Sequence, residues 1–271
     1  MKADLHVHSH YSDGSDSLEK VIKQGVRNGL THLSFVDHDT VDGLQESLTL
    51  GREYGIEIIP GIEISAYDFK RNRKVHILGY NYHPKGSHIR ALCQALLKRR
   101  QEHSLWQIRQ IQTLGYQLEE ENIMESAKPS HTIYKQHIMG HLTNADYDSP
   151  PYRELYQKLF KNNGIAAGDI EYVDVFDAVS AIKADDGMAV VAHPGQLDSY
   201  DLIPELVKIG LDGVERNHPD HTRKDFHMVE TLAERYGLVM TGGTDYHGSF
   251  GTPVEIGSIT SPLNVMLSEC K

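Results

Sequence analysis

The sequence predicts an α/β fold, a barrel of seven strand–helix units interrupted by a helical insertion. Short apolar runs alternate with amphipathic helical patterns through most of the 271 residues. This alternation is typical of parallel strands joined by crossover helices. Between residues 86 and 172 the alternation stops, and only helical patterns follow one another. An open, doubly wound sheet is the alternative arrangement of the same elements.

Seven short apolar runs are the predicted strands of the barrel. They lie at residues 3–7, 32–36, 56–65, 74–82, 188–194, 211–216 and 237–245. Helical patterns at residues 17–30 and 43–55 separate the first three runs, and further helical stretches separate the last three. Each unit therefore pairs a strand of five to ten residues with a crossover long enough to return to the same end of the sheet.

The middle of the chain predicts a helical insertion over residues 86–172. Apolar residues recur at helical spacing through 88–116, where Gly115 is a suitable end, and helices are also predicted over 131–142 and 150–160. We therefore divide the chain into a discontinuous catalytic barrel, residues 1–85 and 173–271, and an insertion that would cover it as a lid. The 184 residues left for the barrel are few for the roughly 250 of an eight-unit barrel, which favours seven units.

The composition excludes several classes of protein. With 27 Lys+Arg against 38 Asp+Glu the net charge is −11, which argues against a broad basic surface for nucleic acid. The insertion holds ten charges of each sign, so the acidity belongs to the barrel. There is no apolar run of about 20 residues and no secretory h-region. The only two cysteines, Cys93 and Cys270, suit a reducing compartment. We expect a cytoplasmic protein without a membrane partner.

Histidines and carboxylates gather at the ends of the predicted strands. The chain contains 17 His. His6 and His8 lie two apart at the end of the first strand, so their side chains leave the same face. Asp13 follows in a polar turn, and other candidates lie at or near the ends of later strands: Asp37, His38 and Asp39, then Glu63, His76, His193, Asp245 and His247.

This pattern predicts a metal centre. A single strand-end His is more often a hydrogen-bonded structural residue than a ligand. Here, however, six of the seven predicted strands carry such residues near their carboxyl ends, the edge at which barrel enzymes build active sites. Without metal, a buried cluster of this kind would leave imidazoles and carboxylates poorly paired. The mixture of imidazole and carboxylate suits Zn, Mn or Fe.

Six motifs carry a family resemblance, and they occur in the family's order. They are DLHVHSHYSDG (4–14), VDHDT (36–40), GIEIS (61–65), VHILGY (75–80), AHPG (192–195) and GGTDYHG (242–248). Together they resemble the polymerase-and-histidinol-phosphatase (PHP) family of metal-dependent phosphoesterases. The insertion and GVERNHPDHT (213–222) further resemble its stand-alone nucleotide phosphatase branch.

The resemblance implies a distorted (β/α)7 TIM-like barrel that holds three divalent transition metal ions. It implies that His6, His8, Glu63 and Asp245 hold the first metal, that Glu63 bridges to a second completed by His76 and His193, and that Asp13, His38 and His247 hold the third. Three divalent ions with these three carboxylates would carry a net charge of about +3, which a hydroxide and a phosphomonoester dianion would balance. The expected nucleophile is a metal-activated hydroxide.

Residues with weaker claims are candidates for substrate contact. Arg99, Arg100, Lys135 and His137 lie on the insertion, where the cations would bind a second phosphate unless they belong to a solvated helix face. His218 ends another strand, where it would donate a proton to the leaving oxygen or serve only as a wall of the pocket. Arg216 has no counterpart in the resemblance and no assigned role.

The predicted activity is hydrolysis of a terminal phosphomonoester on a small nucleotide, such as a nucleoside 3′,5′-bisphosphate, or at the end of a short oligonucleotide. The second anion site offered by the insertion favours nucleotides over the first alternative, histidinol-phosphate phosphatase. A non-catalytic metal-binding or interaction module is the alternative of another class. We expect a small phosphorylated partner without an extended nucleic-acid surface, and the oligomeric state stays open.

Overall fold

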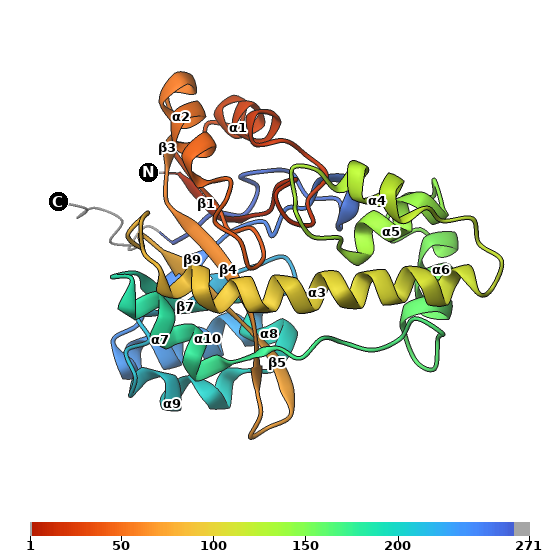
Figure 1. Ribbon diagram of the computed structural model, residues 1–271. Helices are drawn as coiled ribbons and strands as arrows, with labels where there is room; N and C mark the ends of the chain where they lie inside the picture. The colour runs from red at the N-terminus through yellow and green to blue at the C-terminus, as the bar shows by residue number, and fades with distance from the viewer. Residues whose placement is uncertain (1, 263–271) are drawn as a thin grey trace.

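The computed structural model describes residues 2–262 (Figure 1). Its strands are β1 (Ala3–Val7), β2 (His32–Phe35), β3 (Glu57–Ile58), β4 (Gly61–Asp68), β5 (Arg73–Tyr80), β6 (Val173–Asp174), β7 (Met188–Val191), β8 (Gly213–Asn217) and β9 (Val239–Gly242). Its α-helices are α1 (Leu18–Arg27), α2 (Leu44–Tyr54), α3 (His88–Gln112), α4 (Glu120–Ala127), α5 (Lys135–Leu142), α6 (Pro150–Phe160), α7 (Val175–Ala184), α8 (Pro194–Leu197), α9 (Ile203–Val207) and α10 (Arg223–Tyr236). Two 3-10 turns are η1 (Tyr200–Leu202) and η2 (Gly248–Phe250).

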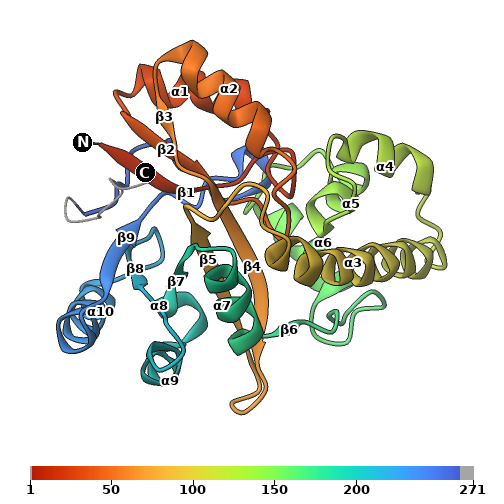
Figure 2. The same cartoon turned by 60° about the vertical axis from the view of Figure 1, so that its left-hand side comes forward.

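The strands form two sheets that together build the distorted barrel. One sheet has the order β1-β2-β3, and the other has the order β6-β4-β5-β7-β8-β9. Single bridges join the sheets at both sides, between Val7 and Tyr246 and between His38 and Glu63. The seven long strands are the seven predicted ones, and helices α1, α2, α7 and α10 surround them (Figure 2). A small apolar core that includes Leu5, Leu78 and Tyr80 fills the interior.

The direction of one strand, β5, differs from the parallel arrangement that the sequence predicts, so that two pairings are antiparallel. Strands β4 and β5 form an antiparallel hairpin, and β5 also runs antiparallel to β7. The cause is the length of the connection, because the four residues between Asp68 and Arg73 form a turn and are too few for a crossover helix. The single predicted strand 56–65 is likewise divided into β3 and β4, at Pro60, which has no N–H for a ladder.

Consecutive helices without strands occupy the stretch predicted as the insertion. Helices α3, α5 and α6 match the predicted patterns, although α3 ends at Gln112 and α5 begins at Lys135. Helix α4 was not predicted, because its eight residues, EENIMESA, are short and mostly polar. Figure 1 shows α4, α5 and α6 gathered around the far end of α3. Their own apolar core draws only on residues between Leu105 and Ala166.

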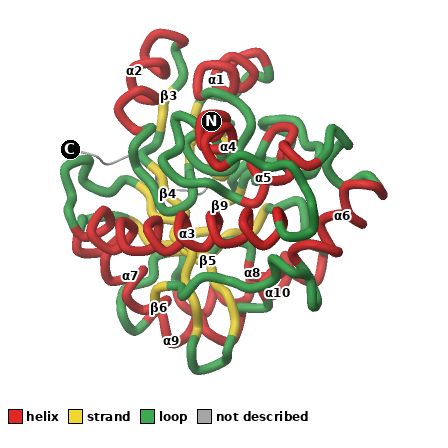
Figure 3. The backbone as a smooth tube through the Cα atoms, turned by 45° about the vertical axis from the view of Figure 1, so that its right-hand side comes forward, coloured by secondary structure: helices red, strands yellow, loops and turns green. Residues whose placement is uncertain are grey.

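Helix α3 belongs to two cores. Near its start, Ile89, Cys93 and Leu96 are buried in the barrel core that also contains helix α7. Further along, Ile108 and Ile111 are buried in the core of the insertion. The tube in Figure 3 shows this helix crossing the front of the sheets. The division of the chain at residues 86 and 172 stays a prediction, because the first turns of α3 pack as part of the barrel.

Two smaller expectations concern membranes and cysteines. Among the described helices, none combines the length and the apolar character needed to cross a bilayer. Cys93 is buried with a free thiol, and Cys270 lies outside the described residues.

Candidate metal centre and active site

The nine predicted metal ligands converge on one centre. Seven of them lie at or after the carboxyl end of a strand, whereas Glu63 is the third residue of β4 and His76 the fourth residue of the antiparallel β5. Each of them belongs to one or more of four overlapping groups in which the ligand atoms lie within 4.8 Å of one another. The groups are His8, Asp13, His38 and His247; His6, Glu63 and His193; His6, His8 and Asp245; and His38, Glu63 and His76. Residues from six different strands or their following loops thus meet at one place.

Glu63 lies at the middle of the cluster. Its two carboxylate oxygens contact five imidazole nitrogens, from His6 at 3.5 Å, His8 at 3.2 Å, His38 at 3.3 Å, and His76 and His193 at 3.0 Å each. The side chain is only 1% exposed. Burial pushes its pKa upward, but the facing imidazoles, with His38 and His76 foremost, hold the pKa well below its ordinary value. Glu63 is therefore ionised, and its carboxylate contacts several imidazoles at once.

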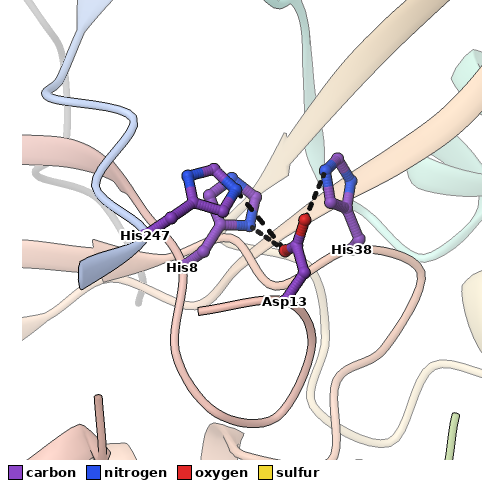
Figure 4. A group of neighbouring side chains, drawn as sticks. All are labelled: His8, Asp13, His38 and His247. Atoms are coloured by element: carbon purple, nitrogen blue, oxygen red, sulfur yellow. Dashed lines mark ion pairs between the residues drawn. The ribbon is translucent and has the colours of Figure 1, made fainter. Parts of the chain in front are cut away.

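Asp245 and Asp13 are the other two carboxylates of the cluster. Asp245 Oδ1 lies 3.2 Å from His6 Nε2 and 3.3 Å from His8 Nε2. Asp13 Oδ1 lies 3.4 Å from His247 Nε2 and 3.7 Å from His8 Nδ1, while Oδ2 lies 3.9 Å from His38 Nε2 (Figure 4). His8 therefore faces three carboxylates, Glu63 and Asp245 through Nε2 and Asp13 through Nδ1, rather than only the first-metal group that the resemblance implies.

The donor set fits metal ions. Among the described residues, Nε2 of His6, both ring nitrogens of His8 and Nδ1 of His38 are buried without a hydrogen-bond partner. Unpaired buried nitrogens are costly, because each has lost its water. Imidazole nitrogens that face shared carboxylates at 3.0–3.9 Å are the donors that transition metals bind. Metal ions would pair these atoms and remove the cost.

Strained backbone aims three side chains of the centre. His193, Asp245 and Asp39 have φ angles of +23°, +49° and +60°, a region that residues other than Gly rarely adopt. All three follow the end of a strand. Such strain persists only where the surroundings fix it, and it is common at active sites. The turn at each strand end thus directs its side chain into the cluster or against its rim.

Glu215 supports the centre from outside, a role that the sequence alone did not reveal. It is fully buried on β8, and its Oε1 accepts a hydrogen bond from His6 Nδ1 at 2.9 Å. Its Oε2 accepts from the backbone N–H of His193 at 2.8 Å. A ligating His commonly donates its second nitrogen to a carboxylate, which fixes the tautomer. Glu215 therefore leaves His6 Nε2 free to bind metal.

A cavity of about 480 Å³ opens from the cluster toward the insertion. Three residues of the cluster line it, Asp13, His38 and His76. Basic and aromatic side chains line it as well: Lys74, Arg100, Lys135, Arg153 and Lys161, with Tyr134, Tyr147, Tyr152, Tyr156 and Tyr172. The cavity thus joins the candidate metal centre to a wall that is rich in cations and tyrosines.

Of the four substrate contacts predicted on the insertion, two line the cavity and two do not. Lys135 lines the cavity, and burial lowers its pKa to about 8. Arg100 also lines it, but donates to Asp39 Oδ2 at 2.6 Å. Arg99 is outside the cavity lining and lies 3.8 Å from Glu171. His137 is buried and caps α5, accepting from the Tyr134 N–H.

On strand β8 and its following loop, His218 and Arg216 also have defined partners. His218 Nδ1 accepts from the Asp220 N–H at 3.1 Å, so the neutral ring carries its proton on Nε2, 3.2 Å from Asp245 Oδ2. His218 adjoins the cluster without lining the cavity. Arg216 pairs with Glu230 at 2.6 Å and stacks on Phe226, which gives this residue a structural role on α10.

Some of the cavity residues could have been found from the sequence. Lys74 precedes His76 by two positions on β5, so both side chains leave the same face of the strand. The tyrosines give a weaker signal: Tyr152 and Tyr156 lie four apart on α6 and stack with ring centroids 6.4 Å apart, a spacing equally typical of a packed helix face.

Comparisons with known proteins agree on the family. The PHP domain model matches residues 4–183. A phosphoribosyl 1,2-cyclic phosphate 1,2-diphosphodiesterase from Eggerthella lenta is 50% identical over 95% of this chain and 98% of its own. A 3′,5′-nucleoside bisphosphate phosphatase from Chromobacterium violaceum is 27% identical over 90% of this chain and 86% of its own.

Solved structures agree on the fold. A protein from Bifidobacterium adolescentis described as a metal-dependent phosphoesterase matches with a TM-score of 0.86 at 24% identity, over 96% of this chain and 92% of its own. A Chromobacterium violaceum amidohydrolase with bound sulfate matches at 0.84 and 25% identity, over 96% and 91%. With the cluster of His, Asp and Glu at the strand ends, these findings lead to one conclusion. The chain belongs to the PHP family of phosphoesterases and is a hydrolase.

Proposed function

We propose that this enzyme hydrolyses the 1,2-cyclic phosphate of a phosphoribosyl group and releases the phosphate in two steps at one metal centre. The observation that carries this proposal is the 50% identity, over 95% of the chain, to a phosphoribosyl 1,2-cyclic phosphate 1,2-diphosphodiesterase. The proposal replaces the nucleotide phosphomonoester as the first candidate. It keeps the predicted bond type, because the second step is hydrolysis of a phosphomonoester.

The proposed centre holds three divalent ions, each Zn, Mn or Fe. The nine ligands are His6, His8, Asp13, His38, Glu63, His76, His193, Asp245 and His247. When bound, such ions lower the pKa of water and neutralise charge on phosphate oxygens. Support comes from the four overlapping ligand groups and from the unpaired buried nitrogens. His8 faces Asp13 through Nδ1 and both Glu63 and Asp245 through Nε2, so it adjoins the ligands of two ions in the predicted sorting.

The chain's own residues have defined tasks in the two steps. In the first, a water oxygen bonds to phosphorus, one of the two ester bonds breaks, and the sugar oxygen that leaves takes a proton. In the second, a further water breaks the remaining ester bond, so that phosphate and the sugar phosphate are the products. His218 is our candidate for the proton donor, since its Nε2 bears a proton beside Asp245.

The lysines that line the cavity suit the phosphate of the phosphoribosyl group. Lys74 and Lys135 both approach Asp169, with Lys74 Nζ 2.5 Å and Lys135 Nζ 3.8 Å from its carboxylate. Lys161 lines the same cavity and adds a third positive charge. Two ammonium groups beside one carboxylate, with Lys161 on the same cavity, leave a positive excess that a phosphate would neutralise. We therefore propose Lys135, with Lys74 and Lys161, as the second anion site.

A nucleotide phosphomonoester remains the second candidate substrate, because of the tyrosines. Tyr147, Tyr152 and Tyr156 line the cavity on one side, and aromatic rings stack on nucleobases. The Chromobacterium violaceum relative is named as a nucleoside bisphosphate phosphatase. Histidinol phosphate is disfavoured, since its ammonium group would face lysines. The 50% identity to a named phosphodiesterase over 95% of the chain argues against a non-catalytic module.

A hydrolysis screen with Mn²⁺, Zn²⁺ or Fe²⁺ tests the proposal. The substrates are phosphoribosyl 1,2-cyclic phosphate, a nucleoside 3′,5′-bisphosphate, a short RNA and histidinol phosphate, with released phosphate measured at neutral pH. We expect the highest kcat/KM for the cyclic phosphate. Turnover of the nucleotide with none of the cyclic phosphate would promote the second candidate instead.

A further inference from the structure

The insertion touches the metal cluster at three points. Gln136 on α5 donates from Nε2 to Asp13 Oδ2 at 2.9 Å. The Tyr134 hydroxyl donates to the backbone carbonyl of His38 at 2.9 Å. Arg100 on α3 donates to the carboxylate of Asp39, the neighbour of His38, at 2.6 Å. All three contacts concern the same part of the cluster, the group formed by His8, Asp13, His38 and His247.

The hydrogen bond from Gln136 gives the two carboxylate oxygens of Asp13 different partners. Oδ1 faces the imidazoles of His247 and His8, at 3.4 and 3.7 Å. Oδ2 accepts a hydrogen bond from the Gln136 amide at 2.9 Å and lies 3.9 Å from His38 Nε2. The carboxylate is only 4% exposed, so water cannot readily replace a lost partner. Gln136 thus fixes the rotation of Asp13 and leaves Oδ1 directed at the imidazoles, as hydrogen-bonded partners of ligating carboxylates do.

Arg100 and Tyr134 fix the backbone that carries His38. Asp39 is fully buried with a positive φ angle, and its Oδ1 accepts from the Ser65 N–H at 2.8 Å. Arg100 Nη2 donates both to Asp39 and to Ser65 Oγ, at 3.0 Å for the latter. The guanidinium also lies 4.9 Å from the ring centroid of Tyr134. The arginine therefore ties the loop after β2 to strand β4 and to the insertion.

We propose that Gln136, Tyr134 and Arg100 are positioning residues through which the insertion holds the Asp13–His38 side of the cluster in ligand geometry. The insertion is then part of the metal site, and Arg100 acts on the loop of His38 rather than on substrate. The inference rests on the metal centre of the proposed function. These three residues are not metal ligands, and their contacts do not depend on which substrate binds.

Metal binding by the purified full chain tests this inference without reference to turnover. The variants are Gln136→Ala and Tyr134→Phe, which removes only one hydroxyl, with Gln117→Ala as the matched control on an exposed position. Metal content is measured by elemental analysis after dialysis against a series of free Mn²⁺ concentrations. We expect Gln136→Ala to weaken one metal position by about 10- to 100-fold, the usual effect of removing a partner of a ligand. Tyr134→Phe should shift the same position, and Gln117→Ala should bind as the wild type does.

Steady-state kinetics on the metal-loaded variants supply the second readout. A positioning role lowers kcat at limiting Mn²⁺, is rescued by excess Mn²⁺, and leaves KM unchanged. Metal affinity equal to wild type in both variants overturns the inference, as does a raised KM at full metal content, which would make Gln136 a substrate contact. If the wild type and an Asp13→Asn reference bind the same amount of metal, the proposed metal centre itself fails.

Discussion

Glu215→Gln tests how much the hydrogen bonds behind the metal ligands contribute to metal binding, because it leaves every proposed ligand unchanged. Glu215 is fully buried and accepts two hydrogen bonds, one from His6 Nδ1 at 2.9 Å and one from the His193 N–H at 2.8 Å. The glutamine has the same shape, but only one of its two terminal atoms accepts. Its amide nitrogen must therefore face one of the two donors, or His6 must move its proton to Nε2.

Both outcomes harm the centre, and their sizes follow from these contacts. A buried donor left without an acceptor costs about 1–3 kcal/mol. A proton on His6 Nε2 occupies the nitrogen that faces Glu63 and Asp245 and so blocks it as a ligand. Loss of a partner that orients a ligating His weakens metal binding by about 10- to 100-fold. We expect both effects in this variant.

Glu57→Gln is the matched control, because Glu57 pairs with His32 at 3.1 Å but is 64% exposed. Urea unfolding of the metal-free proteins and Mn²⁺ titration of the folded ones are the assays. The control should change the free energy of unfolding by less than about 0.5 kcal/mol, since surface pairs contribute little. Metal affinity of Glu215→Gln within twofold of wild type would refute the reasoning.

Three further predictions follow from the site. His8→Ala or Asp245→Ala, or chelation of the wild type, should remove metal and phosphoesterase activity together while circular dichroism stays native, because these residues are proposed ligands rather than core. Burial lowers the pKa of Lys135 to about 8, so the Lys135 side chain of the free enzyme loses its positive charge as the pH rises through 8. The KM for the phosphoribosyl substrate should therefore rise between pH 8 and 10 in the wild type. In Lys135→Arg the KM should change less over the same range. Tyr152→Ala should weaken nucleotide binding by about 1–3 kcal/mol, read from inhibition constants, and affect the phosphoribosyl substrate less.

Each of these predictions has a result that contradicts it. Full turnover at full metal content in His8→Ala would remove that residue from the ligand set. An identical pH profile of KM in wild type and Lys135→Arg would separate Lys135 from the substrate phosphate. Equal losses for both substrates in Tyr152→Ala would make the tyrosine a packing residue, and Tyr54→Ala on the distant helix α2 serves as its control.

Most of the metal cluster could be predicted from the sequence by local rules. Side chains two apart on a strand share a face, and parallel strands end at one edge, so the residues at the ends of β1, β2, β7 and β9 are expected to meet. Glu63 and His76 meet for another reason, because they belong to the antiparallel hairpin of β4 and β5. Glu215 could not be ranked in this way. Its position at a strand end resembles that of a ligand, and only the three-dimensional contact with His6 Nδ1 shows that it lies one layer further out.

The wall of the cavity was harder to predict than the cluster. Arg99 and Arg100 are neighbours on α3, yet adjacent helix positions point about 100° apart. Arg99 lies near Glu171 outside the cavity, and Arg100 is half-buried against Asp39. The antiparallel pairing of β4 and β5 was missed for a different reason. Apolar runs reveal a strand but not its direction, which depended on the length of a four-residue turn.

The long helix α3 has a consequence for how the molecule folds and how it can open. Because Leu96 is buried in one core and Ile108 in the other, melting the helix would open both cores at once. The two cores should therefore unfold in a single cooperative transition, and amide hydrogens along α3 should exchange only through that global event. A continuous helix of 25 residues also makes a poor hinge. Substrate would then enter through side-chain movements at the cavity rim, with the insertion standing still.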